Sequence, residues 1–279
     1  MNPLLEIIKR AKEHGEYLDL HIHTSFSIDV EVGNSFLDFM AEGERLKIIP
    51  GFLDHFQAEK LDEPSYPFNP DNIGYFLETY DRARETGLKS YLGLEIDYYD
   101  DDHEAWNLKT RQWLDQFEGE FDYFVGTIHD VFNHTVTIPS ELAELLLKYD
   151  FKKIQKSYYN TLEKCIKSGM FDGQAHLDVI YRFCGDGGLL NSGIKFLKDK
   201  RTLALMDLCV DRGIAIELNI HGTQHPWKTT YPSEILLLKF LKTRKRASFF
   251  IGSDSHDLKS FKEFAIKVKK YNELLWNRK

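Results

Sequence analysis

Residues 18–29 read LDLHIHTSFSID, an apolar run that ends in two histidines and is followed, six residues after the second, by an aspartate. The run predicts a buried strand over residues 17–22. His21 and His23 lie two residues apart, so both side chains emerge from the same face of an extended chain. A single pair of this kind is more often structural than functional, so its meaning depends on how the other strands end.

Short apolar runs alternate with longer helical patterns along the rest of the chain, the order expected of repeated βα units around a parallel sheet or barrel. Seven strands are expected, at 17–22, 48–53, 90–96, 123–128, 173–175, 214–218 and 248–251. Helices are expected at the N-terminus and at 34–46, 71–86, 106–117, 151–168, 194–211 and 232–243. A chain of 279 residues suits one α/β barrel, so we expect residues 1–279 to form a single domain.

Almost every expected strand ends in a histidine or an acidic residue. In a parallel barrel these strand ends converge on one mouth, where barrel enzymes carry their catalytic groups. Imidazole and carboxylate together suit zinc, manganese or iron, and nine ligands are too many for one ion, so two or three divalent ions are predicted. The candidate metal ligands are His21, His23, Asp29, His55, Glu95, His129, His176, Asp254 and His256.

The charge balance restricts the class of partner. With 36 Lys and Arg against 44 Asp and Glu, the formal net charge is −8, which argues against nucleic acid as the main partner. The basic stretch KTRKR at 242–246 is interpreted as a solvated helix end.

No apolar run approaches the roughly 20 residues that span a bilayer, and no signal peptide is recognised, so we expect a cytoplasmic protein without a membrane partner. Three widely separated cysteines are expected to be buried thiols.

The motifs resemble those of the PHP (polymerase and histidinol phosphatase) family over nearly the whole chain. The matching positions are His21, His23 and Ser27 for HxHxxxS, His55 in a DH pair, Asp254 and His256 in GSDSH, Glu95, His129 and His176 between them, and Asp29 where the family has His or Asp. The resemblance implies a distorted seven-stranded (β/α) barrel, TIM-like, with a trinuclear metal site. Residues 92–99, 176–182 and 216–236 further resemble the histidinol-phosphate phosphatases of this family, whereas DVFNH at 130–134 departs from the expected aromatic-rich stretch.

The resemblance also implies a division of the ligands. Glu95 would bridge two ions, one held also by His21, His23 and Asp254, the other by His129 and His176, while Asp29, His55 and His256 would hold a third. A bound cation lowers the pKa of water from 15.7 toward about 7, which supplies hydroxide to attack phosphorus at neutral pH. Clustered cations also stabilise the charge on the phosphoryl oxygens. Glu95 and Asp254 are therefore among the expected catalytic residues.

Substrate contacts are expected from two further segments. Arg182, six residues after His176, is a candidate phosphate clamp because guanidinium makes a two-point contact with phosphate oxygens, although it could be a surface residue. His221 and His225, after the sixth strand, could protonate the leaving group or contact the substrate, or could simply be solvated. Asn219 and Glu217 could orient the substrate, and we expect one of the two to point into the barrel wall or core. The remaining histidines, His14, His103 and His134, are expected to be incidental.

The expected function is metal-dependent phosphomonoester hydrolysis, most specifically of L-histidinol phosphate to L-histidinol and phosphate in histidine biosynthesis. Alternatives on the same metal site are a nuclease, a nucleotide phosphoesterase or a phosphotyrosine phosphatase; a non-catalytic PHP binding module is an alternative of another class. The acidic balance argues against the nuclease, and retention of all nine ligands argues against the binding module. A small phosphorylated molecule is the expected partner, and the oligomeric state stays open.

Overall fold

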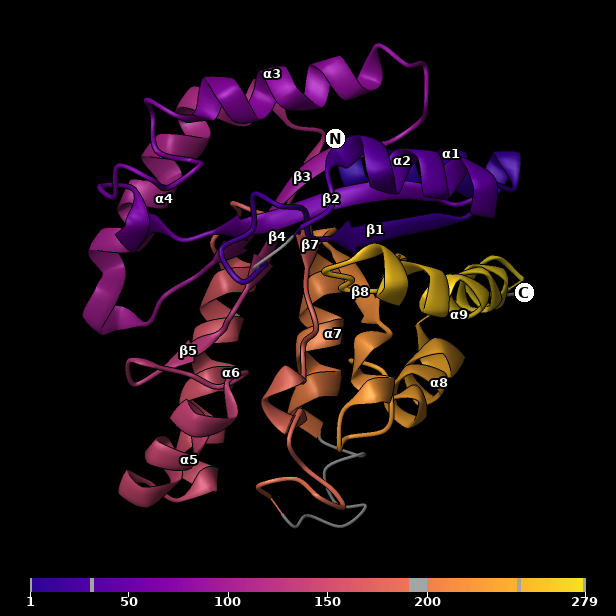
Figure 1. Cartoon of the computed structure of the whole chain (residues 1–279). Coiled ribbons are helices and arrows are strands. Elements are labelled where there is room, and N and C mark those ends of the chain that lie inside the picture. The colour runs from indigo at the N-terminus through magenta and orange to yellow at the C-terminus, as the bar shows by residue number, and fades with distance from the viewer. Residues whose placement is uncertain (1, 31–32, 191–199, 245–246, 278–279) are drawn as a thin grey trace.

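A computed structural model describes residues 2–30, 33–190, 200–244 and 247–277 (Figure 1). Seven of its strands pair in parallel in the order β1-β2-β3-β4-β7-β8-β9. The two ends of this sheet meet: the amide of Asp254, after β9, donates to His21 O in β1 at 2.8 Å, and the amide of His23 donates to Ser255 O at 2.9 Å. The result is a nearly closed barrel, which confirms the predicted (β/α) architecture with seven strands.

The strands lie where the sequence predicts them, with shifted ends. They are β1 Leu18–Ile22, β2 Ile49–Phe56, β3 Tyr91–Asp97, β4 Tyr123–Thr127, β7 Gly173–Gln174, β8 Ala215–Asn219 and β9 Phe249–Gly252. Because β2 continues to Phe56, it includes His55. A hairpin formed by β5 Asp130–Val131 and β6 His134–Thr135 was not predicted. Its turn places Phe132 and Asn133 at positive φ, 51° and 61°, and phenylalanine is an uncommon residue for that conformation.

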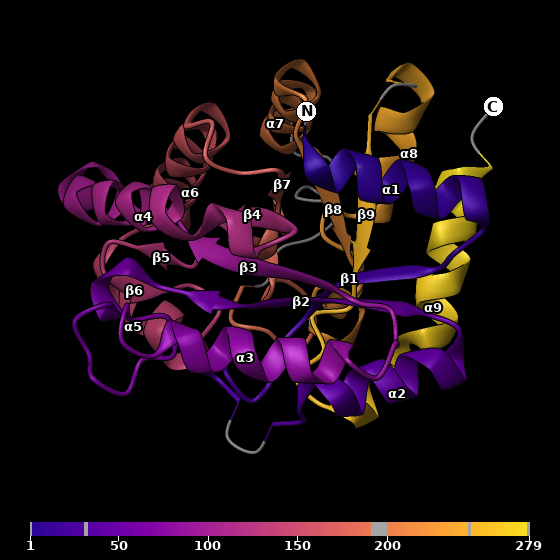
Figure 2. The same ribbon diagram turned by 90° about the horizontal axis from the view of Figure 1, so that it is seen from above.

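The helices lie outside the strands, with α2 and α3 beside β2 and with α7 and α8 beyond β8 (Figure 2). They are α1 Pro3–His14, α2 Phe36–Leu46, α3 Ile73–Arg84, α4 Glu104–Phe117, α5 Pro139–Lys148, α6 Phe151–Lys167, α7 Lys200–Arg212, α8 Glu234–Thr243 and α9 Leu258–Trp276. Helices α5 and α9 were not among those predicted. Part of two predictions, residues 194–199 of a helix and 245–246 of the basic stretch, lies outside the described residues.

Helix α1 covers the N-terminal ends of the strands. The side-chain amide of Asn2, which caps α1, donates to Asp172 O at 2.8 Å and to Gly213 O at 3.0 Å, just before β7 and β8. Leu4 and Ala11 of α1 are buried in one cluster with apolar side chains of the strands, namely Leu18, Leu20, Leu53, Tyr123, Val125, Ala175, Ala215 and Phe250. This end of the barrel is therefore filled by apolar side chains, and polar groups of the strands are left for the opposite end.

Two further sequence predictions can be compared with the structure. The three cysteines, Cys165, Cys184 and Cys209, are all buried, as expected. None of the helices in the described residues combines the length and the apolar character that crossing a bilayer requires.

Candidate metal centre

The predicted ligands come together at the C-terminal mouth of the barrel. His21, His55 and Glu95 lie near the ends of β1, β2 and β3, and the remaining positions follow their strands within a few residues. A cavity of about 470 Å³ opens there. Its lining includes seven of the nine predicted ligands: Asp29, His55, Glu95, His129, His176, Asp254 and His256. The other two, His21 and His23, are fully buried beneath them.

Glu95 lies at the centre, with only 1% of the residue exposed. Its Oε2 is 3.2 Å from His21 Nε2 and 3.2 Å from His55 Nδ1, and its Oε1 is 2.8 Å from His176 Nε2 and 3.6 Å from His129 Nε2. Burial alone would raise the pKa of this carboxyl group, but the surrounding imidazoles lower it well below its usual range. Glu95 is thus an ionised carboxylate whose two oxygens face different sets of histidines, as a bridging ligand requires.

His21 and His23 point toward the same space as Asp254. His21 Nε2 is 3.1 Å from His23 Nε2, and His23 Nε2 is 3.2 Å from Asp254 Oδ1. Where both nitrogens are unprotonated, their lone pairs face and repel each other. A cation or a proton shared between the two nitrogens would remove this repulsion. Asp254 itself has a left-handed backbone, with φ of 56°. This conformation is locally unfavourable for a residue with a side chain, so the surrounding structure must hold it.

Asp29, His55 and His256 form the outer part of the cluster. Asp29 Oδ2 is 3.2 Å from His55 Nε2 and 2.8 Å from His256 Nε2. The His23 ring stacks between the two imidazoles, with ring centroids 4.5 Å from His55 and 4.3 Å from His256. Asp29 comes from the loop after β1 and His256 from the segment after β9, so the closure of the barrel brings these residues together.

Four overlapping groups of donor atoms have all members within 4.8 Å of one another: His23, Asp29, His55 and His256; His21, His23 and Glu95; His55, Glu95 and His129; and His221, Asp254 and His256. Several buried atoms in this region, His176 Nδ1 and Gln57 Oε1 among them, find no hydrogen-bond partner among the described residues. Mixed nitrogen and oxygen donors of this kind suit divalent transition metals. The cluster therefore fits metal ions.

Buried carboxylates orient the histidines from behind. His21 Nδ1 is 2.7 Å from Glu217 Oε1, and His129 Nδ1 is 2.8 Å from Asp97 Oδ1. A ring N–H that donates to a carboxylate leaves Nε2 as the lone-pair nitrogen for a metal. Burial is the largest single influence and lowers the pKa of His129, but the charges of Asp97 and Glu95 and the hydrogen bond to Asp97 together raise that pKa to about 10. The sequence analysis did not assign Asp97, although it lies two residues after Glu95 and therefore on the same strand face.

The expectation that Glu217 or Asn219 points into the barrel wall or core is wrong. Both side chains reach the site: Asn219 Nδ2 is 3.2 Å from Glu217 Oε1 and 3.2 Å from Asp254 Oδ2. Residues two apart on a strand share a face, so neither can turn away without the other. Glu217 also accepts a hydrogen bond from the amide of His176 at 2.7 Å, which ties β8 to the segment after β7.

The predicted substrate contacts lie beside this cluster. Arg182, directly after the 3₁₀ turn Val179–Tyr181, lines the same cavity, and its buried Nε has no hydrogen-bond partner among the described residues. His221 Nδ1 is 3.5 Å from Asp254 Oδ2, and the His225 ring centroid is 4.7 Å from that of His221. Burial, with Arg182 and His221 nearby, lowers the pKa of His225 to about 3. His225 is therefore neutral at neutral pH, which favours a substrate contact over proton donation.

The histidines expected to be incidental include two with partners elsewhere. His103 Nδ1 is 2.8 Å from Asp100 Oδ1, and its ring stacks on Trp106 at 4.4 Å. His134 Nε2 is 3.0 Å from Lys148 Nζ. Both contacts involve residues that do not line the cavity.

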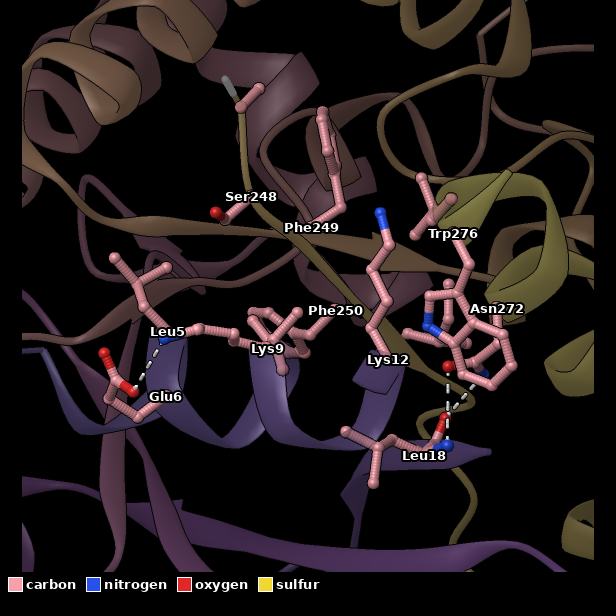
Figure 3. A pocket seen from close by; sticks show the side chains of 14 residues that line it. Leu5, Glu6, Lys9, Lys12, Leu18, Ser248, Phe249, Phe250, Asn272 and Trp276 are labelled. Carbon is pink, nitrogen blue, oxygen red and sulfur yellow. Dashed lines mark hydrogen bonds and ion pairs between the residues drawn. The ribbon is translucent and has the colours of Figure 1, made fainter. Parts of the chain in front are cut away.

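A second hollow, of about 380 Å³, lies between α1, β9 and α9 (Figure 3). Its lining is mainly apolar, with Leu5, Phe249 and Trp276 among the residues. Of its polar residues, Lys9 lies 4.0 Å from Glu6 in an ion pair, and the Asn272 side chain bonds to the backbone of Leu18. No histidine lines this hollow within the described parts of the chain, so the metal-ligating chemistry belongs to the opposite end of the barrel.

Comparisons with known proteins show what this chain is similar to. The model of the family described as PHP domain matches residues 19–221. A protein of Deinococcus radiodurans described as a probable histidinol-phosphatase is 26% identical over 210 residues, which cover 74% of this chain and 73% of that protein. A crystal structure of histidinol phosphate phosphatase from Lactococcus lactis subsp. lactis Il1403, complexed with zinc, L-histidinol and phosphate, matches with a TM-score of 0.67 at 21% identity, covering 92% of this chain and 94% of that one. This structural likeness shows the fold.

Removing a central donor should release metal. We expect His21→Ala and Asp254→Ala each to reduce the metal bound per chain after reconstitution with zinc or manganese, because each leaves a multidentate group with one donor fewer. Elemental analysis after gel filtration measures this. His103→Ala, which removes a histidine paired outside the cavity, is the control and should keep the wild-type metal content. Equal metal content in all three variants would contradict the cluster as a metal centre.

Asp97→Asn should weaken metal binding without removing a donor atom. The amide no longer supplies an anionic acceptor to His129 Nδ1, and loss of such a supporting carboxylate typically lowers metal affinity about 10–100-fold. Competition with a chelator measures the affinity. Asp100→Asn is the matched control, since it breaks the same kind of pair at His103. An unchanged affinity in Asp97→Asn would show that His129 needs no orienting partner.

Proposed function

This chain belongs to the PHP domain family, and from that premise we propose that it is a metal-dependent phosphomonoesterase that hydrolyses L-histidinol phosphate to L-histidinol and phosphate. The observation that carries the proposal is the convergence of imidazoles and carboxylates around the buried carboxylate of Glu95 at the barrel mouth. The relative from Deinococcus radiodurans and the Lactococcus lactis structure support the choice of substrate. A place in histidine biosynthesis would follow from that substrate.

Two or three divalent ions, zinc, manganese or iron, are proposed for the site. The distances support the following division: His21, His23 and Asp254 on one side of Glu95, His129 and His176 on another, and Asp29, His55 and His256 as the outer group. Bound there, such ions would lower the pKa of water and offset the charge of a phosphate group.

The protein groups around the metal ligands have distinct proposed tasks. Arg182 would bind phosphate oxygens, since its Nε is buried beside the metal ligands with no partner in the described residues. Asn219 is held between Glu217 and Asp254 and can donate to an incoming substrate atom only by giving up one of those bonds. His221, beside Asp254, and His225, near Arg182, would contact the substrate from that side of the site. We place Glu95, Asp254, Arg182 and His225 among the catalytic residues.

The first test is a substrate comparison. Metal-reconstituted protein should release phosphate from L-histidinol phosphate with a kcat/KM on the order of a hundredfold above that for p-nitrophenyl phosphate, phosphotyrosine and nucleotides, a difference of about 2.7 kcal/mol in transition-state binding. A short oligonucleotide tests the nuclease alternative in the same assay. Preference for a nucleotide or the oligonucleotide would overturn the substrate but keep the phosphoesterase. Activity on none of these compounds would favour a non-catalytic binding module.

Arg182→Ala tests the phosphate contact. We expect a higher KM and a kcat lower by on the order of a hundredfold, the usual effect of losing one charge-stabilising donor, with metal content unchanged. Steady-state kinetics together with elemental analysis separate the two effects. Kinetics like those of the wild type would remove Arg182 from the site, whereas loss of metal would show that it acts on the ligands instead.

A further inference from the structure

The cavity at the barrel mouth carries two carboxylates that the proposed metal centre does not use. Glu59 lies in the 3₁₀ turn Ala58–Lys60 that follows β2, and Asp130 begins the β5–β6 hairpin. Both line the cavity of about 470 Å³ together with the metal-ligating side chains. The cavity therefore has a negative wall beyond its metal ligands, and part of that wall stands on the hairpin that the sequence analysis did not predict.

Both carboxylates accept a hydrogen bond from a hydroxyl group. Glu59 accepts a hydrogen bond from the Tyr99 hydroxyl, and Asp130 Oδ1 accepts one from Thr135 Oγ1 at 2.7 Å. Neither takes part in an ion pair within the described residues. Lys60, which also lines the cavity, has its Nζ 3.9 Å from Glu63 Oε1.

Asp130 lies close enough to Glu59 to act on it electrostatically. Burial, followed by the charges of Asp97 and Asp130, raises the pKa of Glu59. Like charges that are partly buried repel each other and lower the stability of the folded protein. A positively charged ligand group placed between them would relieve this cost.

The side chain of Gln57 adds a hydrogen-bond acceptor to the same wall of the cavity. Gln57 lines the cavity; its Nε2 donates to Asp97 Oδ2 at 2.9 Å, and its buried Oε1 finds no hydrogen-bond partner in the described part of the chain. A carboxylate and an amide oxygen can only accept hydrogen bonds, so this wall suits an N–H donor and repels phosphate. The phosphate must then lie at the metal ligands and Arg182, with the rest of the substrate toward this wall.

We propose that Glu59 and Asp130, with Gln57 Oε1, hold the cationic end of the substrate, so that the enzyme selects phosphomonoesters whose alcohol carries an ammonium or imidazolium group. The inference rests on the proposed phosphatase function and names its specificity-determining residues. It also predicts discrimination against substrates with further negative charges, because a second phosphate would face these carboxylates.

The test compares the wild type with Glu59→Gln, Asp130→Asn and the double variant. Asp62→Asn, an exposed carboxylate that pairs with Lys109 outside the cavity, is the matched control. The ratio of kcat/KM for L-histidinol phosphate to kcat/KM for p-nitrophenyl phosphate, whose leaving group carries no positive charge, should drop roughly tenfold or more in the double variant, as expected for loss of a partly screened charge pair. The control should keep the wild-type ratio.

A binding measurement separates this inference from the phosphatase proposal. Calorimetry with L-histidinol alone, which lacks phosphate, should show binding to the metal-loaded wild type that weakens by roughly tenfold or more in the double variant. If the wild type hydrolyses no phosphomonoester, the proposed function fails and this measurement alone decides the inference: equal binding to both proteins overturns it.

Three further outcomes overturn the inference while the phosphatase proposal stands. The first is a wild-type enzyme with no preference for the cationic ester. The second is an equal loss of kcat/KM on both esters in the double variant, which would mean a structural role. The third is loss of a metal ion in Glu59→Gln or Asp130→Asn, which would mean that these carboxylates hold metal. Thermal unfolding of each variant checks that it is folded.

Discussion

The buried carboxylate of Glu95 is the constraint on which the rest of this structure depends. A charge with 1% of its residue exposed is tolerated only where opposite charge or good donors surround it, and here imidazoles from β1, β2 and the segments after β4 and β7 do so. These histidines can meet only if the strands run in parallel and end at one mouth. The barrel topology and the polar cluster therefore require each other.

The opposite, N-terminal end of the barrel is apolar, in contrast to the polar mouth. Apolar side chains of the strands, with Leu4 and Ala11 of α1, fill the N-terminal end. The barrel interior is thus polarised along the strands, with an apolar cluster at the N-terminal end and the proposed metal ligands at the C-terminal end. Within the mouth, a second distinction separates carboxylates beside imidazoles, such as Glu95 and Asp254, whose pKa is lowered despite burial, from carboxylates beside hydroxyls, Glu59 and Asp130, whose pKa burial raises.

Much of the fold could be predicted because its signals are local. Short apolar runs followed by a histidine or carboxylate located the strands of the barrel, and parallel topology alone then brings the strand ends together. The supporting groups were harder to predict. Asp97 and Glu217 act through contacts across the barrel, and the erroneous treatment of Glu217 and Asn219 came from overlooking that residues two apart share a strand face. The β5–β6 hairpin was missed because its turn places phenylalanine and asparagine, rather than glycine, at positive φ.

Asp254 shows what such a site costs the fold. Its left-handed backbone, φ 56°, carries a conformational penalty on the order of 1 kcal/mol that glycine would not incur. Yet glycine would remove the carboxylate that faces His23 and Asn219. At this position the residue that favours stability differs from the residue that the site needs. Selection for a higher free energy of unfolding alone would therefore replace this aspartate. Consensus-style or stability-driven redesign of this barrel would have to leave the residue unchanged, although it is locally unfavourable.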